Sequence, residues 1–95
     1  MRFNSDDYGL RIRSLRKNRG LTQEQLAEKM NVSTPYNAKI ETGKQTGPVG
    51  LAVEFAAFFD VSLDYLLAGK GDFAEEQKRG LRMAISLLSE LEASL

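Results

Sequence analysis

The side chains that most enzymes use for catalysis are missing from this sequence. It contains no His and no Cys, so it lacks the commonest general base, the thiolate nucleophile and two common metal ligands. No Gly-rich phosphate loop is present, and the adjacent carboxylates Asp6–Asp7 and Glu75–Glu76 are typical of solvated surface charge. We therefore expect no enzyme activity, no metal site and no cofactor.

The distribution of charged side chains is compatible with binding to a nucleic acid, although the formal net charge is zero. Residues 11–44 contain eight Lys or Arg against three Glu, whereas residues 45–69 contain three acidic residues and no basic one. A separation of this kind can create a one-sided electrostatic field. The basic side chains of residues 11–19 fit either a nucleic-acid surface or a solvated helix face.

Length and composition indicate one small domain. A chain of 95 residues can hold one modest core, and 42% hydrophobic with 27% charged residues fits a globular protein. No apolar run approaches the roughly 18 residues of a membrane span, and the N-terminus lacks the apolar segment of a signal peptide. We expect a cytoplasmic protein with no membrane contact.

Capping residues, glycines and prolines predict a chain made of helices with no strand. Thr22 and Gln25 match a capping box, while Asn31 and Gly43 stand where a left-handed residue ends a helix. The pattern predicts five short helices and a longer C-terminal one. They span about residues 6–18, 22–30, 33–42, 49–59, 63–67 and 74–94.

A three-residue turn, Asn31–Ser33, separates the second and third of these helices. Asn31 can supply a positive φ, Ala27 allows the two helices to approach closely, and Val32 can fill the gap between them. This arrangement predicts a helix-turn-helix unit.

Five segments, in order and at matching spacing over residues 10–67, together resemble the Cro/cI-type (XRE) family of helix-turn-helix regulators. They are Ile12–Lys17, Gly20–Ala27, Val32–Ser33, Ile40–Lys44 and Phe59–Leu67. The resemblance implies an all-α fold: a five-helix Cro/cI repressor-like DNA-binding domain over residues 1–69, with an added C-terminal amphipathic helix over residues 70–95. It also implies a bacterial, sequence-specific transcriptional regulator, most often a repressor, that binds double-stranded DNA as a homodimer.

The same resemblance implies which residues meet DNA, because in this family the helix after the turn enters the major groove. The base-contacting positions are Thr34, Pro35, Ala38 and Lys39. The phosphate-contacting positions are Gln23, Ser33, Tyr36, Lys44, Gln45 and Thr46. Lys39 can donate to guanine, whereas Pro35 and Ala38 offer only apolar contact, so we expect DNA shape to contribute to specificity. Arg16 and Glu41 match a structural salt bridge.

Asn37 departs from the family pattern, which places a large apolar residue on this side of the recognition helix. A buried amide without partners costs about 1–3 kcal/mol. Either Asn37 finds a partner, or the helix rotates so that Tyr36 fills the gap. Rotation would change which residues face the groove.

The C-terminal segment carries an apolar stripe at three- and four-residue steps, formed by Leu81, Ile85, Leu88 and Leu91. Such a stripe needs a partner surface. We expect a dimerisation helix, because two recognition helices about 34 Å apart read a two-fold symmetric site. Folding back onto its own domain is the alternative.

A second class of function also fits the residues. A protein-interaction module of the same fold, an adaptor or antitoxin-like partner with weak or no DNA binding, is favoured by three features. These are the few hydrogen-bonding side chains at the base-facing positions, Asn37 and the zero net charge.

Overall fold

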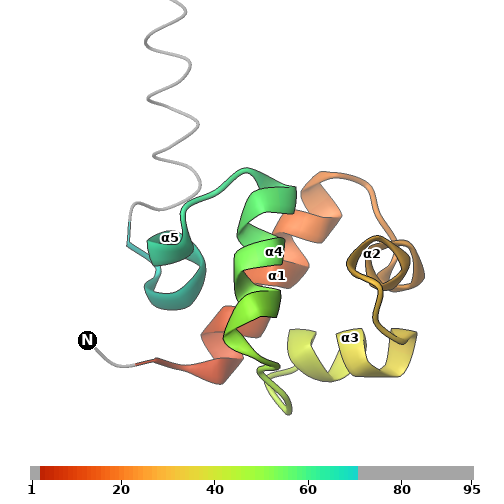
Figure 1. Cartoon of the computed structure of the whole chain (residues 1–95), viewed down its shortest axis with the longest axis horizontal. Coiled ribbons are helices and arrows are strands. Elements are labelled where there is room, and N and C mark those ends of the chain that lie inside the picture. The colour runs from red at the N-terminus through yellow and green to blue at the C-terminus, as the bar shows by residue number, and fades with distance from the viewer. Residues whose placement is uncertain (1–2, 71–95) are drawn as a thin grey trace, which may run out of the picture.

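The computed structural model describes residues 3–70, and over this range the chain is helical with no strand (Figure 1). The helices are α1 (Ser5–Asn18), α2 (Gln23–Met30), α3 (Thr34–Glu41), α4 (Val49–Phe59) and α5 (Leu63–Ala68). The predicted all-α, five-helix fold is confirmed. The helix predicted for residues 74–94, and with it the stripe of Leu81, Ile85, Leu88 and Leu91, lies outside the described residues.

Local capping explains where most helices begin. Thr22 and Gln25 form the predicted capping box, in which each side chain accepts from the backbone N–H of the other residue. The side chains that cap helix N-termini are Asn4, Thr22, Ser33 and Ser62. Each such cap stabilises a helix by about 1 kcal/mol. The exception is α4, which follows Pro48 and receives no side-chain cap.

Left-handed residues end two of the helices without glycine. Asn31 closes α2 at φ 58°, as predicted, and Asp60 closes α4 at φ 55°. Asn and Asp tolerate this conformation better than other non-glycine residues. The turn after Asn31 sets the direction in which α3 leaves α2.

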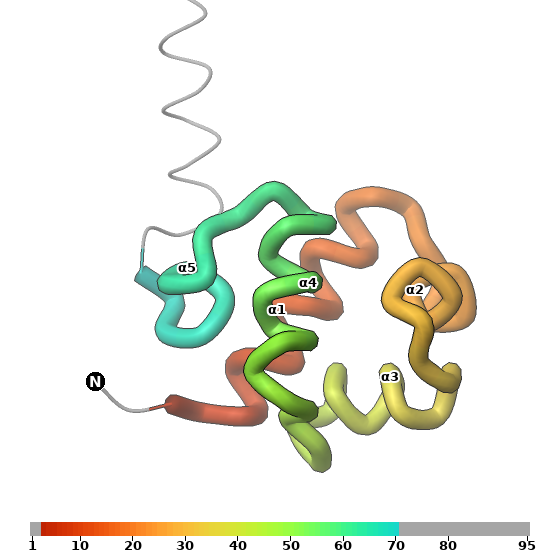
Figure 2. Tube along the Cα trace, viewed as in Figure 1, coloured from red at the N-terminus to blue at the C-terminus, as the bar shows by residue number. Residues whose placement is uncertain are grey.

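The core is one apolar cluster to which every helix contributes. Ile12, Leu26, Ile40, Phe55 and Leu66, one residue from each helix in turn, are fully buried. α3 packs on α1 and α2, while α5 packs on α1 and α4. The helix-turn-helix pair α2–α3 therefore lies at the opposite end of the domain from α5 (Figure 2).

A close backbone contact joins α1 to the end of α3. A Cβ atom at Gly9 would collide with the carbonyl oxygens of Ile40 and Glu41. Gly9 is itself buried. The missing side chain at this position therefore lets the two helices approach closely.

Candidate nucleic-acid interface

One face of α3 is presented to solvent. Thr34, Pro35 and Lys39 are exposed, while Ala38 is half-buried. Ser33 is exposed too, and its hydroxyl oxygen accepts the N–H of Tyr36 at 3.2 Å as the helix cap. All four positions expected to meet bases thus belong to one short helix, and three of them are fully accessible.

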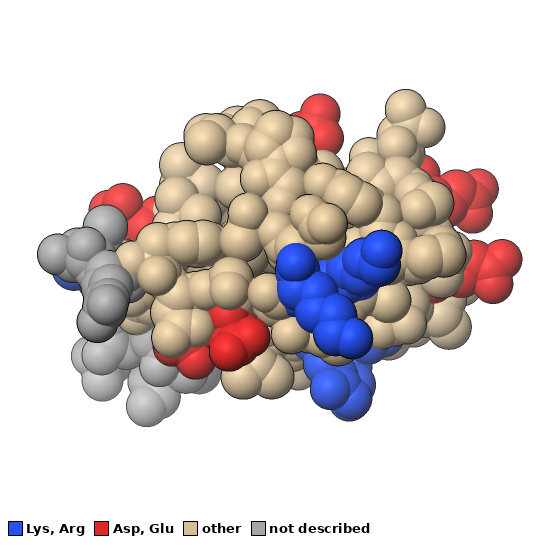
Figure 3. Space-filling model, turned by 90° about the horizontal axis from the view of Figure 1, so that it is seen from below, with Lys and Arg blue, Asp and Glu red and all other residues tan. Residues whose placement is uncertain are grey.

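The exposed charges carried by α3 and the segments flanking it in sequence are positive. Between residues 31 and 53 the exposed charged side chains are Lys39 and Lys44, because Glu41 is only 3% exposed. Figure 3 views the molecule from the side on which α3 lies and shows basic side chains gathered near the middle, with acidic side chains directly beside them and at the edges. The neutral total therefore coexists with a basic patch, as the charge distribution predicted.

A buried ion pair fixes α3 against α1. Arg16 Nε lies 2.9 Å from Glu41 Oε2, and Arg16 Nη2 donates to Glu41 Oε1 at 3.0 Å. A third donor, Arg16 Nη1, reaches the carbonyl of Leu21 at 2.8 Å, just before α2. The predicted salt bridge is present and connects three elements of the fold. Breaking one partner of such a buried pair costs about 3–5 kcal/mol.

Asn37 joins the same network. Its side chain is fully buried, and Nδ2 donates to Glu41 Oε2 at 2.9 Å and, more weakly, to the carbonyl of Gln23 at 3.5 Å. Oδ1 has no partner within the described residues. Of the two alternatives, the first is observed: Asn37 finds partners, and α3 does not rotate to replace it with Tyr36, which packs half-buried at the edge of the core.

Gln23 has an intramolecular partner that its sequence position does not reveal. Its Nε2 donates to Glu41 Oε1 at 3.4 Å, and the residue is half-buried. A primary amide carries two N–H groups, so one can remain on Glu41 while the other points to a ligand. Glu41 thereby orients the side chain at the start of α2.

The loop after α3 is tied to the helix that precedes it. The backbone N–H groups of Lys44 and Gln45 both donate to the carbonyl of Lys39, at 2.9 and 3.2 Å. The side chains of Lys44 and Gln45 are exposed, and Thr46 is half-buried. The loop residues expected to meet phosphate are therefore held close to the end of α3.

Arg11 in α1 and Arg19 directly after α1 both form contacts within the domain. Arg11 Nε donates to the carbonyl of Leu66 in α5 at 2.9 Å. The Arg19 guanidinium lies 5.1 Å from the ring centroid of Phe58 and 5.5 Å from that of Phe59, a cation–π geometry. Arg13 and Lys17 are exposed.

Within residues 3–70, no helix is long and apolar enough to cross a membrane.

Known proteins share this arrangement. The uncharacterised HTH-type transcriptional regulator YqaE of Bacillus subtilis is 32% identical over 73 residues, which cover 74% of this chain and 63% of the relative. YobD of the same organism is 40% identical over 60 residues, covering 63% of this chain and 54% of YobD. The HTH-type transcriptional activator BcrR of Enterococcus faecalis is 36% identical over 64 residues, which cover 67% of this chain and 31% of BcrR. The chain thus spans between about a third and two thirds of these relatives.

Solved structures agree on the fold. The restriction-modification controller protein C.AhdI from Aeromonas hydrophila matches with a TM-score of 0.61 and 26% identity, over 67% of this chain and 93% of C.AhdI. The biofilm master regulator SinR, solved in complex with DNA, matches with a TM-score of 0.56 and 37% identity, over 62% of this chain and 95% of SinR. The SinR–SinI complex matches with a TM-score of 0.62 and 32% identity, over 82% of this chain and 78% of the matched chain.

The helix-turn-helix family profile matches residues 12–66, which include α2, the turn at Asn31 and α3. With relatives that are themselves HTH-type regulators, this chain belongs to the helix-turn-helix family of the XRE, or Cro/cI, type.

Proposed function

We propose that the chain is a sequence-specific DNA-binding transcriptional regulator that places α3 in the major groove. The observation that carries the proposal is the solvent-facing side of α3, which includes Lys39. The helix is held by the buried Arg16–Glu41–Asn37 network and carries no exposed acidic side chain. A rigid helix with accessible polar and basic side chains is what direct base readout requires. The DNA complex of the similar protein SinR supports the same role.

In this proposal the base contacts come from four residues with unequal capacities. Lys39 donates to guanine O6 and N7, and Thr34 offers a hydroxyl and a methyl group. Pro35 and Ala38 supply only apolar contact. Sequence preference at the remaining positions then comes from the deformability of the DNA.

Phosphate contacts hold the helix in register. The proposed residues are Gln23, Ser33, Tyr36, Lys44, Gln45 and Thr46. Gln23 lies in the first turn of α2, where the positive end of the helix dipole favours an anion. Lys44 contributes a charge from the loop that is tied to Lys39.

We further propose that the protein acts in the cytoplasm as a homodimer and represses by covering promoter DNA. Residues 1–69 form the DNA-binding domain and residues 70–95 the dimerisation helix, with Leu81, Ile85, Leu88 and Leu91 at its interface. The support is the apolar stripe in the sequence and the two-fold symmetry of the sites that paired recognition helices read.

A protein-interaction module is the second candidate. The SinR–SinI complex, a structure with two protein partners, is similar over 82% of this chain. The sparse hydrogen-bonding capacity of Pro35 and Ala38 also fits a surface that contacts protein. In this reading the C-terminal segment or α3 binds another polypeptide.

Binding to DNA separates the two candidates. Fluorescence anisotropy is measured with the upstream DNA of the gene and with random DNA, at about 50 and about 200 mM salt. A regulator prefers the upstream fragment at both salt concentrations. Lys39→Ala should reduce that preference by about 1–3 kcal/mol, whereas Lys70→Ala, which removes the same charge beyond α5, should not. Absence of binding at either salt concentration would overturn the proposal.

A further inference from the structure

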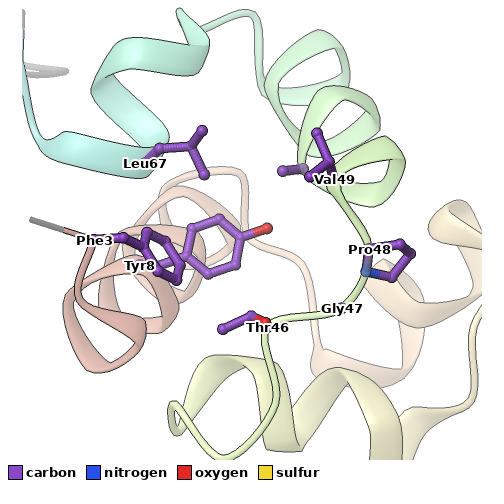
Figure 4. Close-up of a pocket in the computed structure, with 8 residues that line it drawn as sticks. Phe3, Tyr8, Thr46, Gly47, Pro48, Val49 and Leu67 are labelled. Carbon is purple, nitrogen blue, oxygen red and sulfur yellow. The ribbon is translucent and has the colours of Figure 1, made fainter.

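A cavity of about 280 Å³ opens between the start of α1, the loop before α4, the first turns of α4, and α5 (Figure 4). Its walls are almost entirely apolar: Phe3, Val49, Ala52 and Leu67 contribute to them. Phe3 is 48% exposed and Val49 74% exposed at its rim. A concave, mainly apolar site of this size, with few polar groups, is typical of small-molecule sites.

One polar group in the wall of this site is covered by its neighbours and has no partner. Tyr8 is 1% exposed, and no residue of the described chain forms a hydrogen bond with its hydroxyl. Figure 4 shows the hydroxyl pointing into the space between Thr46 and Val49. A buried hydroxyl without a partner destabilises the folded chain. A ligand that supplies an acceptor would recover this cost.

The hydroxyl is a donor at any physiological pH. Burial raises the pKa of Tyr8 from 10.0 to about 12, with a further contribution from Tyr36. The O–H group can therefore donate to an acceptor, such as a carbonyl or ether oxygen, and it carries no charge that would favour a cation. The apolar walls exclude a strongly charged molecule, because its desolvation would go uncompensated.

We propose that this cavity binds a small, mainly apolar molecule with one hydrogen-bond acceptor, to which the Tyr8 hydroxyl donates. An apolar cavity of about 150 Å³ already holds benzene. The larger volume here accommodates an aromatic ring with a short substituent. The acceptor belongs on that substituent, directed at Tyr8.

The neighbouring backbone can adjust to admit such a molecule. The hydroxyl oxygen is buried in the empty cavity, so an acceptor reaches it only if the wall near Val49 yields. Val49 begins α4, the helix that lacks a side-chain N-cap, and its side chain is mostly exposed. Helix ends without caps open at lower cost than capped ones.

Two probes of nearly equal shape test the role of the hydroxyl. Acetophenone carries an accepting carbonyl oxygen, whereas α-methylstyrene carries a CH₂ group in its place. Each is titrated into the isotope-labelled full-length protein, and dissociation constants are taken from the NMR shifts of the backbone amides of residues 46–47 and 49–52. With Tyr8→Phe, acetophenone should bind about 5-fold more weakly, the equivalent of one hydrogen bond, and α-methylstyrene should bind unchanged.

A second pair of variants tests the location. Ala52→Leu extends a buried wall residue into the cavity and should abolish binding of both probes. Ala57→Leu adds the same atoms to an exposed position of α4 and should preserve binding. If Ala52→Leu does not fold by circular dichroism, the Tyr8→Phe comparison decides alone.

Three results would overturn the proposal. They are the absence of binding by either probe, an equal response of both probes to Tyr8→Phe, and binding retained by a folded Ala52→Leu variant. The experiment contains no DNA, so its outcome is independent of the proposed regulatory function.

Discussion

Asn37 and Glu41 lie one turn apart in α3 and are joined inside the domain, where Asn37 Nδ2 donates to Glu41 Oε2 at 2.9 Å. The same carboxylate receives the guanidinium of Arg16 from α1. An amide donates to a carboxylate without adding charge. α3 is thus fastened by a polar contact at a position where packing of an apolar side chain would otherwise do so.

Asn37→Asp should show how much this contact contributes to the free energy of unfolding. The substitution keeps the shape but sets two carboxyl groups in one buried site with one Arg. We expect the free energy of unfolding to fall by about 2–4 kcal/mol at about pH 7. The loss should shrink at about pH 4, where the new carboxyl keeps its proton and can donate it.

Urea unfolding of variant and wild type at the two pH values measures this difference. Asn18→Asp, at the exposed end of α1, is the matched control and should change stability by less than about 0.5 kcal/mol. Equal losses for Asn37→Asp at both pH values would contradict the donor role of Asn37.

Lys44→Ala should weaken DNA binding without changing its sequence preference. A lysine that meets phosphate carries no base information. Affinity for upstream and random DNA should fall by the same factor, and the salt slope should lessen by about 1 for each site lost. Anisotropy over a salt series measures both quantities. A loss confined to the upstream fragment would instead assign Lys44 to a base.

Two glycines should respond to alanine in opposite directions. At Gly9 the added Cβ meets the backbone of Ile40 and Glu41, which cannot move aside, and we expect a loss of about 2–3 kcal/mol or more. At Gly50, within α4, nothing lies within 4 Å of the added atom, and we expect a gain of about 0.5–1 kcal/mol. Thermal and urea unfolding of both variants test the pair. A tolerated Gly9→Ala would mean that α1 and α3 pack more loosely than described.

Tyr8 should make the protein sensitive to alkali. Because the pKa of Tyr8 is raised by burial from 10.0 to about 12, the unfolded chain loses this proton first as the pH rises. Stability is therefore unaffected below pH 10 and falls between pH 10 and pH 12, by about 2–3 kcal/mol. Tyr8→Phe should remove this part of the loss and leave stability at neutral pH equal or higher, because the variant lacks a buried hydroxyl without a partner. Parallel pH profiles for the two proteins would argue against a raised pKa.

Local signals accounted for most of the fold. The capping box of Thr22 and Gln25 and the left-handed Asn31 act within a few residues of their own positions, so sequence spacing is enough to predict them. Asp60 ends α4 in the same conformation, but without glycine or Asn at that position the pattern gave no sign of it.

Contacts between distant residues set the limit of prediction for the site. The spacing of residues identified Gln23 as a helix start, but its bond to Glu41 crosses 18 positions and depends on how α2 meets α3. Asn37 left two outcomes open because its partner is a carboxylate held from α1. Tyr8 was not predicted as a core residue, although it stands one turn before Ile12 on the buried face of α1. The acidic residues Asp6 and Asp7 beside it suggested a solvated segment.

The buried network and the exposed side chains of α3 belong to different residues, and this separation has an evolutionary consequence. No hydrogen bond within residues 3–70 ties the side chain of Thr34 or Lys39 to the domain, and exposed positions of this kind change stability by less than about 0.5 kcal/mol when substituted. Arg16, Asn37 and Glu41 are buried, and their contacts stabilise the fold. Substitutions at the exposed positions of α3 can therefore change what the helix binds during evolution without a loss of stability.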